Sequence, residues 1–179
     1  MREDEVDPLV ERIRTAALRL FNELGYGSAT IEDIARASGV GVGTIYRRWP
    51  DKAALANDLY VLVLETFAQY EEKMPSYRSR KGRFVGLWMT MFAFADAHRE
   101  LVLFLEGQPH DAYINSRNRR RKRDKDAKTA ALLSELGITA PADVAMAMLV
   151  GTLAQCIRTG SKFDPKDMGE RLWRALAKR

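Results

Sequence analysis

Two short stretches of this chain carry side chains whose types and spacing suit contact with an anion. Residues 42–52, VGTIYRRWPDK, gather hydroxyl groups and three cations in one segment. Residues 117–123, RNRRRKR, hold six cations and no acid. Hydroxyl, guanidinium and ammonium groups donate hydrogen bonds to phosphate, and arginine can also bind guanine through two bonds. Both stretches are therefore candidates for contact with nucleic acid.

The positive net charge does not by itself identify the nucleic-acid surface. The six cations of residues 117–123 exceed the net charge of +5, so the rest of the chain has a net charge of −1. Residues 1–52 contain eight Arg or Lys against nine Asp or Glu. The simplest interpretation of the basic run is a solvated helix face or loop. Two functional interpretations are also open: the run could bind an acidic or phosphorylated effector such as an acyl-coenzyme A, or it could add to the attraction for DNA. DNA binding must therefore be argued from sequence pattern.

Other chemistries have few candidate residues. Cys156 is the only cysteine, which excludes an intramolecular disulfide and disfavours a thiolate zinc site. Neither His98 nor His110 stands in a recognisable catalytic or metal-binding constellation. We expect His98 to end or flank a helix and His110 to lie in a loop. The sequence predicts no enzyme activity, no metal and no cofactor.

The N-terminal residues and the length of the apolar runs indicate where in the cell the protein is located. The first ten residues, MREDEVDPLV, are acidic and lack the order of a secretion signal. No apolar run approaches the length needed to cross a bilayer. We therefore expect a cytoplasmic protein.

Residues 9–24 predict the first of the helices that must position residues 42–52. Their apolar side chains recur every three or four positions, which makes one apolar stripe. Asp7 followed by Pro8 supplies a cap and a first helical residue, and Gly25 supplies the left-handed residue that ends the helix.

Two shorter helices follow with equally clear borders. Thr30 and Asp33 form a capping-box pair, and Gly39 ends that helix after about two turns. Gly41 can cap a third helix, which Pro50 prevents from continuing. Two short helices joined across a glycine-containing turn match a helix-turn-helix, whose second helix enters the major groove.

Every later periodic segment also reads as helical, so the predicted fold class is all-α. Asp51 caps a long helix that extends to a break at Pro75, and residues 84–95 and 101–105 form two more. The basic run lies in a polar helix or loop. Residues 141–159 are apolar or small on almost every side, and residues 165–179 form a final amphipathic helix. One chain cannot bury all the apolar surface of these two helices, so the sequence predicts that they pair with the same helices of a second subunit.

The segment ATIEDIARASGVGVGTIYRRWPDKAAL, following a capped first helix, resembles the N-terminal DNA-binding domain of the tetracycline-repressor (TetR/AcrR) family over residues 9–55. The resemblance implies an all-helical homodimer that binds a palindromic DNA operator. It divides the chain into a helix-turn-helix domain, residues 1–52, and a helical effector-binding and dimerisation domain, residues 53–179. The implied function is a transcriptional repressor that a small-molecule effector releases from its operator.

The resemblance also implies roles for individual residues near the predicted recognition helix. Phosphate contacts are expected from Thr30, Tyr46 and Lys52. Contacts with base edges or thymine methyl groups are expected from Val42, Gly43, Thr44 and Arg47. Arg48 is assigned to DNA with its target, phosphate or base, left open. Trp49 is expected to pack beneath the motif.

Two further sets of residues are assigned to the C-terminal domain. Large adaptable side chains could line an effector pocket, although such a stripe is also typical of an ordinary core: Phe67, Tyr70, Trp88, Met91, Phe92, Phe104 and Tyr113. The dimer interface is expected to use residues of the last two helices: Leu149, Thr152, Leu153, Cys156, Leu172, Trp173 and Leu176. Cys156 is expected to be a small buried residue.

Two alternative functions remain open from the sequence. One is a dimeric DNA-binding or architectural regulator that has no effector. The other is a nucleotide-binding enzyme that uses residues 39–43, GVGVG, as a phosphate-binding loop. Such a loop follows a strand and precedes a long helix, whereas residues 39–43 lie between two short helices and lack the lysine of a P-loop.

Overall fold

Helices make up nearly all of the part of the chain that the computed structural model describes, residues 7–107 and 112–177. Their bounds are α1 Pro8–Ser28, α2 Ile31–Ser38, α3 Val42–Arg48, α4 Lys52–Glu72, α5 Arg80–Ala97, α6 Arg99–Gly107, α7 Ser116–Glu135, α8 Ala142–Thr159 and α9 Pro165–Leu176. Within these ranges the only β pairing is an isolated bridge between Ile138 and Ala177. The predicted all-α fold class is confirmed.

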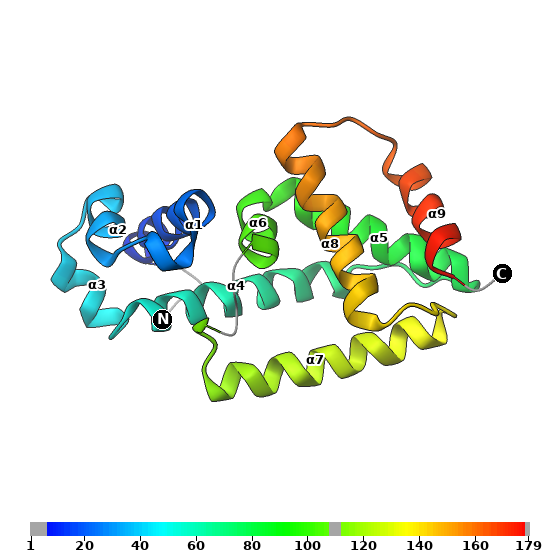
Figure 1. Ribbon diagram of the computed structural model, residues 1–179, viewed down its shortest axis with the longest axis horizontal. Helices are drawn as coiled ribbons and strands as arrows, with labels where there is room; N and C mark the ends of the chain where they lie inside the picture. Colours follow the sequence, from blue (N-terminus) through cyan, green and yellow to red (C-terminus); the bar gives the residue numbers. More distant parts are fainter. Residues whose placement is uncertain (1–6, 108–111, 178–179) are drawn as a thin grey trace.

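The helices form two groups joined by the long helix α4 (Figure 1). Helices α1 to α3 lie together at one end, and α5, α8 and α9 lie toward the other. Helix α5 packs on α9, α1 packs on α2 and α6, and α6 also packs on α8. Helix α7 runs along the side of the molecule beside α4 (Figure 1) and contacts α8. None of the helices in the described ranges is long and apolar enough to cross a membrane.

The first helix begins as predicted and ends slightly later than predicted. Asp7 Oδ1 accepts a hydrogen bond from Leu9 N at 2.9 Å, which caps the N-terminus of α1. Gly25 has φ 79° and ψ 155°, so regular helix stops there. One further turn follows before Ala29 N donates to Gly25 O at 3.2 Å. The glycine therefore kinks the element, and the chain leaves it at Ser28.

The borders of α2 and α3 are those that the sequence predicts. Thr30 caps α2, and Gly39, in the left-handed conformation at φ 66°, ends it. Gly41 is the N-cap residue of α3. Residues 39–43 are thus the turn of a helix-turn-helix and the start of a seven-residue helix, with a helix rather than a strand before them. This arrangement is not that of a phosphate-binding loop.

Helix α9 docks on α5 through a tryptophan that contacts a glycine. Trp88 has no exposed surface, and its Nε1 donates to Pro165 O at 2.7 Å. A Cβ atom added at Gly169 would lie 2.6 Å from Trp88 Cδ1, so only glycine allows this approach. Trp173 of α9 lies against Phe84 of α5, with ring centroids 5.5 Å apart.

Helix α6 connects the two groups. Asn22 Nδ2 of α1 donates to Glu100 Oε2 at 2.7 Å, and the rings of Phe21 and Phe104 lie 6.1 Å apart. On the other side, Arg158 of α8 forms an ion pair with Glu106 of α6. Helix α6 therefore contacts both α1 and α8 directly.

The basic run lies in a helix, which settles the choice between helix and loop. Helix α7 begins at Ser116, with Asn115 as its cap, and residues 117–123 occupy its N-terminal half. His98 is the C-cap residue of α5, as expected. His110 lies outside the described residues.

Candidate nucleic-acid interface

Helix α3 presents its cations on one side and is anchored on the other. Tyr46 is 46% exposed, and Arg47 and Arg48 are exposed beside it. Ile45 has no exposed surface, and Trp49 is 5% exposed, so these two side chains fix the helix to the core. The expectation that Trp49 packs beneath the motif is confirmed. The outer face of α3 is thus a rigid, polar surface.

The first turn of α3 has small side chains, and the hydroxyl group of Thr44 orients Arg47. Arg47 Nη2 donates to Thr44 Oγ1 at 3.1 Å, which holds the guanidinium along the helix. A Cβ atom at Gly43 would have no neighbour within 4 Å, so the backbone is open to close approach there. Val42 is half-buried and packs against the core, leaving part of its side chain for an apolar contact. The structure thus leaves these four residues together on one accessible helix.

Thr30 lies at the exposed start of α2, where its hydroxyl completes the capping pair. Thr30 Oγ1 accepts from Asp33 N at 3.1 Å and donates to Asp33 Oδ2 at 2.6 Å. The hydrogen bond from Thr30, aided by Arg36, lowers the pKa of the Asp33 carboxyl. A phosphate contact by Thr30 stays a prediction, since its hydroxyl proton already has an acceptor in the chain.

The ammonium group of Lys52 binds backbone carbonyls at the end of α1, and the expected phosphate contact stays a prediction. Its Nζ donates to Tyr26 O at 2.6 Å, to Gly27 O at 3.2 Å and to Ala29 O at 2.8 Å. Because an ammonium group has three donors, all of them are occupied. The Nζ atom also lies 4.6 Å from the centroid of the Tyr26 ring. Lys52 therefore locks the end of α1 to the start of α4.

Arg12 holds the helix-turn-helix in place, a role that sequence reasoning missed. Its Nη2 donates to Ser38 O at 2.5 Å and to Gly39 O at 3.3 Å. These carbonyls lie at the C-terminus of α2, where a cation is favoured by the helix dipole. No local spacing could have revealed the contact, because Arg12 and Ser38 are 26 residues apart.

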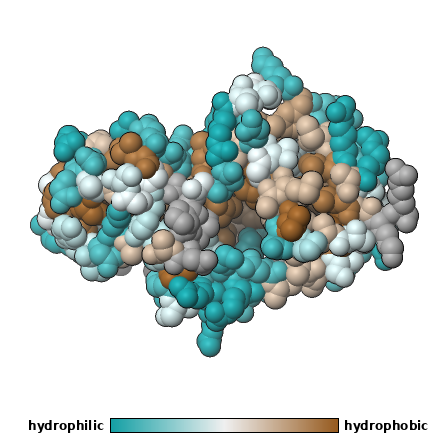
Figure 2. All heavy atoms as spheres, in the orientation of Figure 1, coloured by the Kyte–Doolittle hydropathy of each residue, from teal (hydrophilic) through white to brown (hydrophobic). Residues whose placement is uncertain are grey.

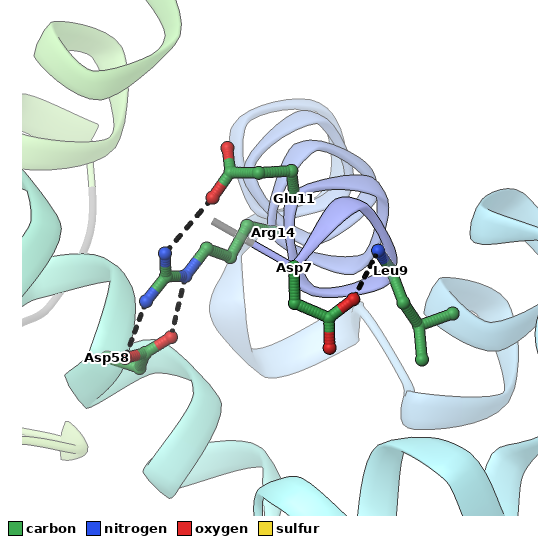
Figure 3. A network of polar contacts seen from close by, with 5 residues as sticks. All are labelled: Asp7, Leu9, Glu11, Arg14 and Asp58. Carbon is green, nitrogen blue, oxygen red and sulfur yellow. Dashed lines mark hydrogen bonds and ion pairs between the residues drawn. The ribbon is translucent and has the colours of Figure 1, made fainter. Parts of the chain in front are cut away.

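Arg14 fixes α1 to α4 (Figure 3). Its Nε and Nη2 donate to the two carboxylate oxygens of Asp58 at 2.9 and 3.0 Å, and its Nη1 donates to Glu11 Oε1 at 3.1 Å. The bonds with Asp58 raise the pKa of Arg14 above its ordinary value. A bidentate pair of this kind is more directional than a simple surface ion pair. It sets the angle at which the helix-turn-helix leaves α4.

Most residues predicted to line an effector pocket pack in or against the hydrophobic core. Phe67 and Tyr70 pack edge-on against Phe94, with centroids 5.3 and 5.6 Å away. Phe104 and Tyr113 are buried, with their ring centroids 6.0 Å apart. The Trp88 ring contacts α9 and Met91 is buried, so these side chains fill the core.

One predicted pocket residue, Phe92, lines a surface cleft between α5 and the C-terminal end of α8. The cleft has a volume of about 500 Å³. Its apolar wall includes Leu153, Ile157 and Phe163, and the Phe92 and Phe163 rings meet at 5.5 Å. Charged and polar residues also line the cleft: Arg99, Lys162, Asp96, Ser161 and Cys156. Burial raises the pKa of the Cys156 thiol, which is half-buried rather than fully buried as expected.

Most residues predicted for the dimer interface lie inside the subunit's own core. Leucines of α8 and α9 are at most 8% exposed: Leu149, Leu153, Leu172 and Leu176. Thr152, Cys156 and Trp173 are half-buried. The apolar surface that α8 leaves exposed belongs to neighbouring positions, with Val144 47% and Met148 42% exposed. The participation of α8 and α9 in a dimer interface stays a prediction.

Comparison with known proteins identifies relatives of the N-terminal region. Residues 13–59 match the family described as bacterial regulatory proteins, tetR family. The HTH-type transcriptional repressor KstR2 of Mycobacterium tuberculosis is 29% identical over 115 residues, which are 60% of this chain and 58% of KstR2. The chain thus matches less than two thirds of the length of this relative.

Solved structures share the fold over nearly the whole chain. A TetR family transcription regulator from Marinobacter aquaeolei is similar with a TM-score of 0.75 and 16% identity, over 96% of both chains. The transcriptional regulator FadR of Bacillus subtilis, solved in complex with stearoyl-CoA, has a TM-score of 0.66 and 16% identity, over 94% of this chain and 97% of FadR. At such identities the likeness concerns the fold.

Proposed function

We propose that this chain, whose residues 13–59 match the tetR family of bacterial regulatory proteins, is a homodimeric repressor that binds a palindromic DNA operator through α3. The observation that carries the proposal is the outer face of α3, where Tyr46, Arg47 and Arg48 are exposed above a buried Ile45. A helix held in this way can enter a major groove without rearranging. Residues 1–52 and 53–179 serve as the reading and regulatory parts.

Selection from a random duplex library tests this proposal. Wild-type protein should enrich a palindrome whose half-sites are about one helical turn apart, roughly 34 to 36 Å. Arg47→Ala should change the preferred bases, because an arginine that contacts a base edge specifies it. The matched control is Arg78→Ala, an exposed arginine beyond the end of α4. Failure of folded, dimeric protein to enrich any sequence would refute the proposal.

Dimerisation is proposed to use the exposed face of α8. Val144 and Met148 lie one turn apart on this face and expose apolar surface. A two-fold pairing of α8 with its copy, beside α9, would cover both residues in each subunit. Met148→Glu should therefore give a monomer in sedimentation, whereas Met89→Glu, at an exposed methionine of α5, should leave the dimer intact.

The effector is proposed to occupy the cleft between α5 and α8. Its apolar wall suits an apolar chain, and Arg99 and Lys162, which outnumber the one acid of the lining, Asp96, favour an anionic group on the same molecule. Arg99 Nη2 also donates to Ile157 O at 3.1 Å, so a ligand there would act on α6 and, through it, on α1. Because FadR of Bacillus subtilis, which shares the fold, was solved in complex with stearoyl-CoA, we choose acyl-CoA and fatty acids as the first probes.

Operator release provides the test for an effector. Fatty acids or acyl-CoA should lower the affinity for the selected operator, and Phe92→Ala should reduce that response without altering DNA binding in their absence. A response that Phe92→Ala leaves unchanged would place the effector elsewhere. A complete lack of response to these probes would favour the regulator without an effector.

A further inference from the structure

One side of α7 forms a row of arginines, the α7 ridge, consisting of Arg117, Arg120 and Arg123. These residues are spaced three apart, which puts them on one side of the helix about 4.5 Å apart along its axis. All three are exposed. Among the described residues, no acid forms an ion pair with any of them, although neighbouring cations of α7 do have such partners.

Two other cations of α7 form ion pairs with acids of α4. Arg121 faces Glu65 at 4.0 Å, and Lys125 faces Glu71 at 3.8 Å. Lys125 Nζ also lies 4.8 Å from the Phe67 ring centroid. Helix α7 is therefore attached to α4 by cations outside the ridge, and the ridge is exposed with one acid, Asp124, one turn from Arg120.

The position of the ridge within α7 is unfavourable for the helix itself. The N-terminal end of a helix carries partial positive charge, so cations there oppose the helix dipole and acids favour it. The first turn of α7 contains no acid, and only the Asn115 side chain caps it, accepting from Asn118 N at 2.9 Å. A bound anion would be attracted both by the arginines and by the helix end.

The ridge is held next to the DNA-binding region by buried contacts. Asn57 Oδ1 of α4 accepts from Asn115 N at 3.0 Å and from Asn118 Nδ2 at 3.1 Å, and both Asn57 and Asn118 are 5% exposed. The Tyr113 ring lies 4.9 Å from the Tyr26 ring, on which Lys52 Nζ rests. Figure 1 shows the N-terminal end of α7 on the side of the reading helices. In Figure 2 this part of α7 forms a hydrophilic lower edge.

We propose that the α7 ridge binds DNA backbone phosphates outside the base pairs that α3 reads. The inference rests on the proposed function, because it assigns the same DNA a second contact. Residues 1–52 carry a net charge of −1, and the ammonium of Lys52 is occupied by carbonyls, so the reading region itself offers few cations to phosphate. Arginine suits this role because its planar group binds phosphate through two hydrogen bonds.

The test compares two duplexes at several salt concentrations. One duplex carries only the selected operator, and the other extends it by about one helical turn at each end, roughly 10 base pairs. The wild-type protein should bind the extended duplex more tightly and with a steeper salt dependence. The variant R117Q/R120Q/R123Q should lose this gain, with the slope of log K against log salt falling by about 0.9 for each phosphate contact removed.

A matched variant removes three cations from a different surface. K73Q/R78Q/R80Q lowers the charge equally, at exposed positions between the end of α4 and the start of α5. It should bind the extended duplex like the wild type. Since glutamine favours helix and the ridge opposes the helix dipole, R117Q/R120Q/R123Q should melt no lower than the wild type. Loss of DNA affinity without loss of stability then identifies a binding surface.

The possible outcomes separate this inference from the proposed function. Unchanged binding by R117Q/R120Q/R123Q overturns the inference, and so does an equal loss in both triple variants, which would reflect total charge. Loss of inorganic polyphosphate binding with DNA binding intact would assign the ridge to a small polyanion instead. If the selection yields no operator, the proposed function fails, and mixed-sequence duplex then tests the ridge by the same comparison.

Discussion

The helix borders of α1 to α3 depend mostly on local contacts, whereas the C-terminal helices α5 and α9 are fastened to each other by contacts between distant residues. In α1 to α3, most helix borders depend on a residue that acts within four positions of itself, as Thr30 acts on Asp33 and Gly25 on Ala29. In the C-terminal part, α5 is fastened to α9 by Trp88 with Pro165, 77 residues apart, and by Lys81 with Glu170, 89 residues apart. Local contacts can be recognised in a sequence, whereas distant contacts require the fold.

The largest expected effect breaks the long-range contact of the C-terminal part. Trp88→Ala removes a fully buried ring and its hydrogen bond with Pro165 O, and should lower the free energy of unfolding by about 3 to 5 kcal/mol in urea titrations. Hydrogen exchange should show α9 losing protection first. Trp49→Ala is the matched change in the other region and should expose α2 and α3 instead. Identical exchange patterns in the two variants would mean that the regions do not differ.

Lys52 sharpens the comparison because it makes long-range contacts within the DNA-binding region. Lys52→Met keeps the length of the side chain but removes three hydrogen bonds, and should cost about 2 kcal/mol of unfolding free energy. The salt dependence of DNA binding should stay unchanged, because no phosphate contact is lost. Lys73→Met, at an exposed lysine, is the control for stability. A lower salt slope with unchanged stability would restore the phosphate role.

Thr30 tests a purely local contact. Thr30→Ala removes the cap of α2 and should lower the free energy of unfolding by about 1 kcal/mol, whereas Thr30→Ser should retain most of it. Thermal melting of the three proteins measures the difference. An equal loss in both variants would mean that the methyl group, not the hydroxyl, stabilises the helix.

The smallest expected effect is the pH dependence of the same cap. The pKa of Asp33 is lowered in the folded chain, so this carboxylate stabilises the fold at pH values above its unfolded pKa of about 3.9 and loses that contribution as the pH falls. Asp33→Asn should therefore be less stable than the wild type at neutral pH, with the difference shrinking in acid. A difference that is constant with pH would show that the charge has no role.

Sequence reasoning located the DNA-binding helices because each border is marked by a residue with few conformational choices. Thr30 at a helix start, Gly39 at a left-handed helix end and Pro50 after a helix each act on the adjoining backbone. The family resemblance, and not a helix border, predicted that Trp49 packs beneath the motif, where its side chain is 5% exposed.

The remaining site contacts could not be predicted because they depend on where distant segments meet. The carbonyls that receive Lys52 become available only when Gly25 kinks the end of α1. Aromatic residues at helical spacing do not reveal which neighbour they face, so the sequence could not tell that Phe67 contacts Phe94 and that Phe104 contacts Tyr113. Because both sides of α8 are apolar, the sequence could not tell either which of its residues the subunit itself covers.

The buried Asn57 that anchors α7 also determines how α7 can move. A shift of α7 along α4 would break both hydrogen bonds that the buried amide oxygen of Asn57 accepts from α7 and its cap. Each unpaired buried polar group costs about 1 to 3 kcal/mol, so partly displaced positions of α7 are poorly populated. The N-terminal end of α7 is therefore fixed in register with α4, and a change at this end of α7 is transmitted to α4 as a change in position of both helices together.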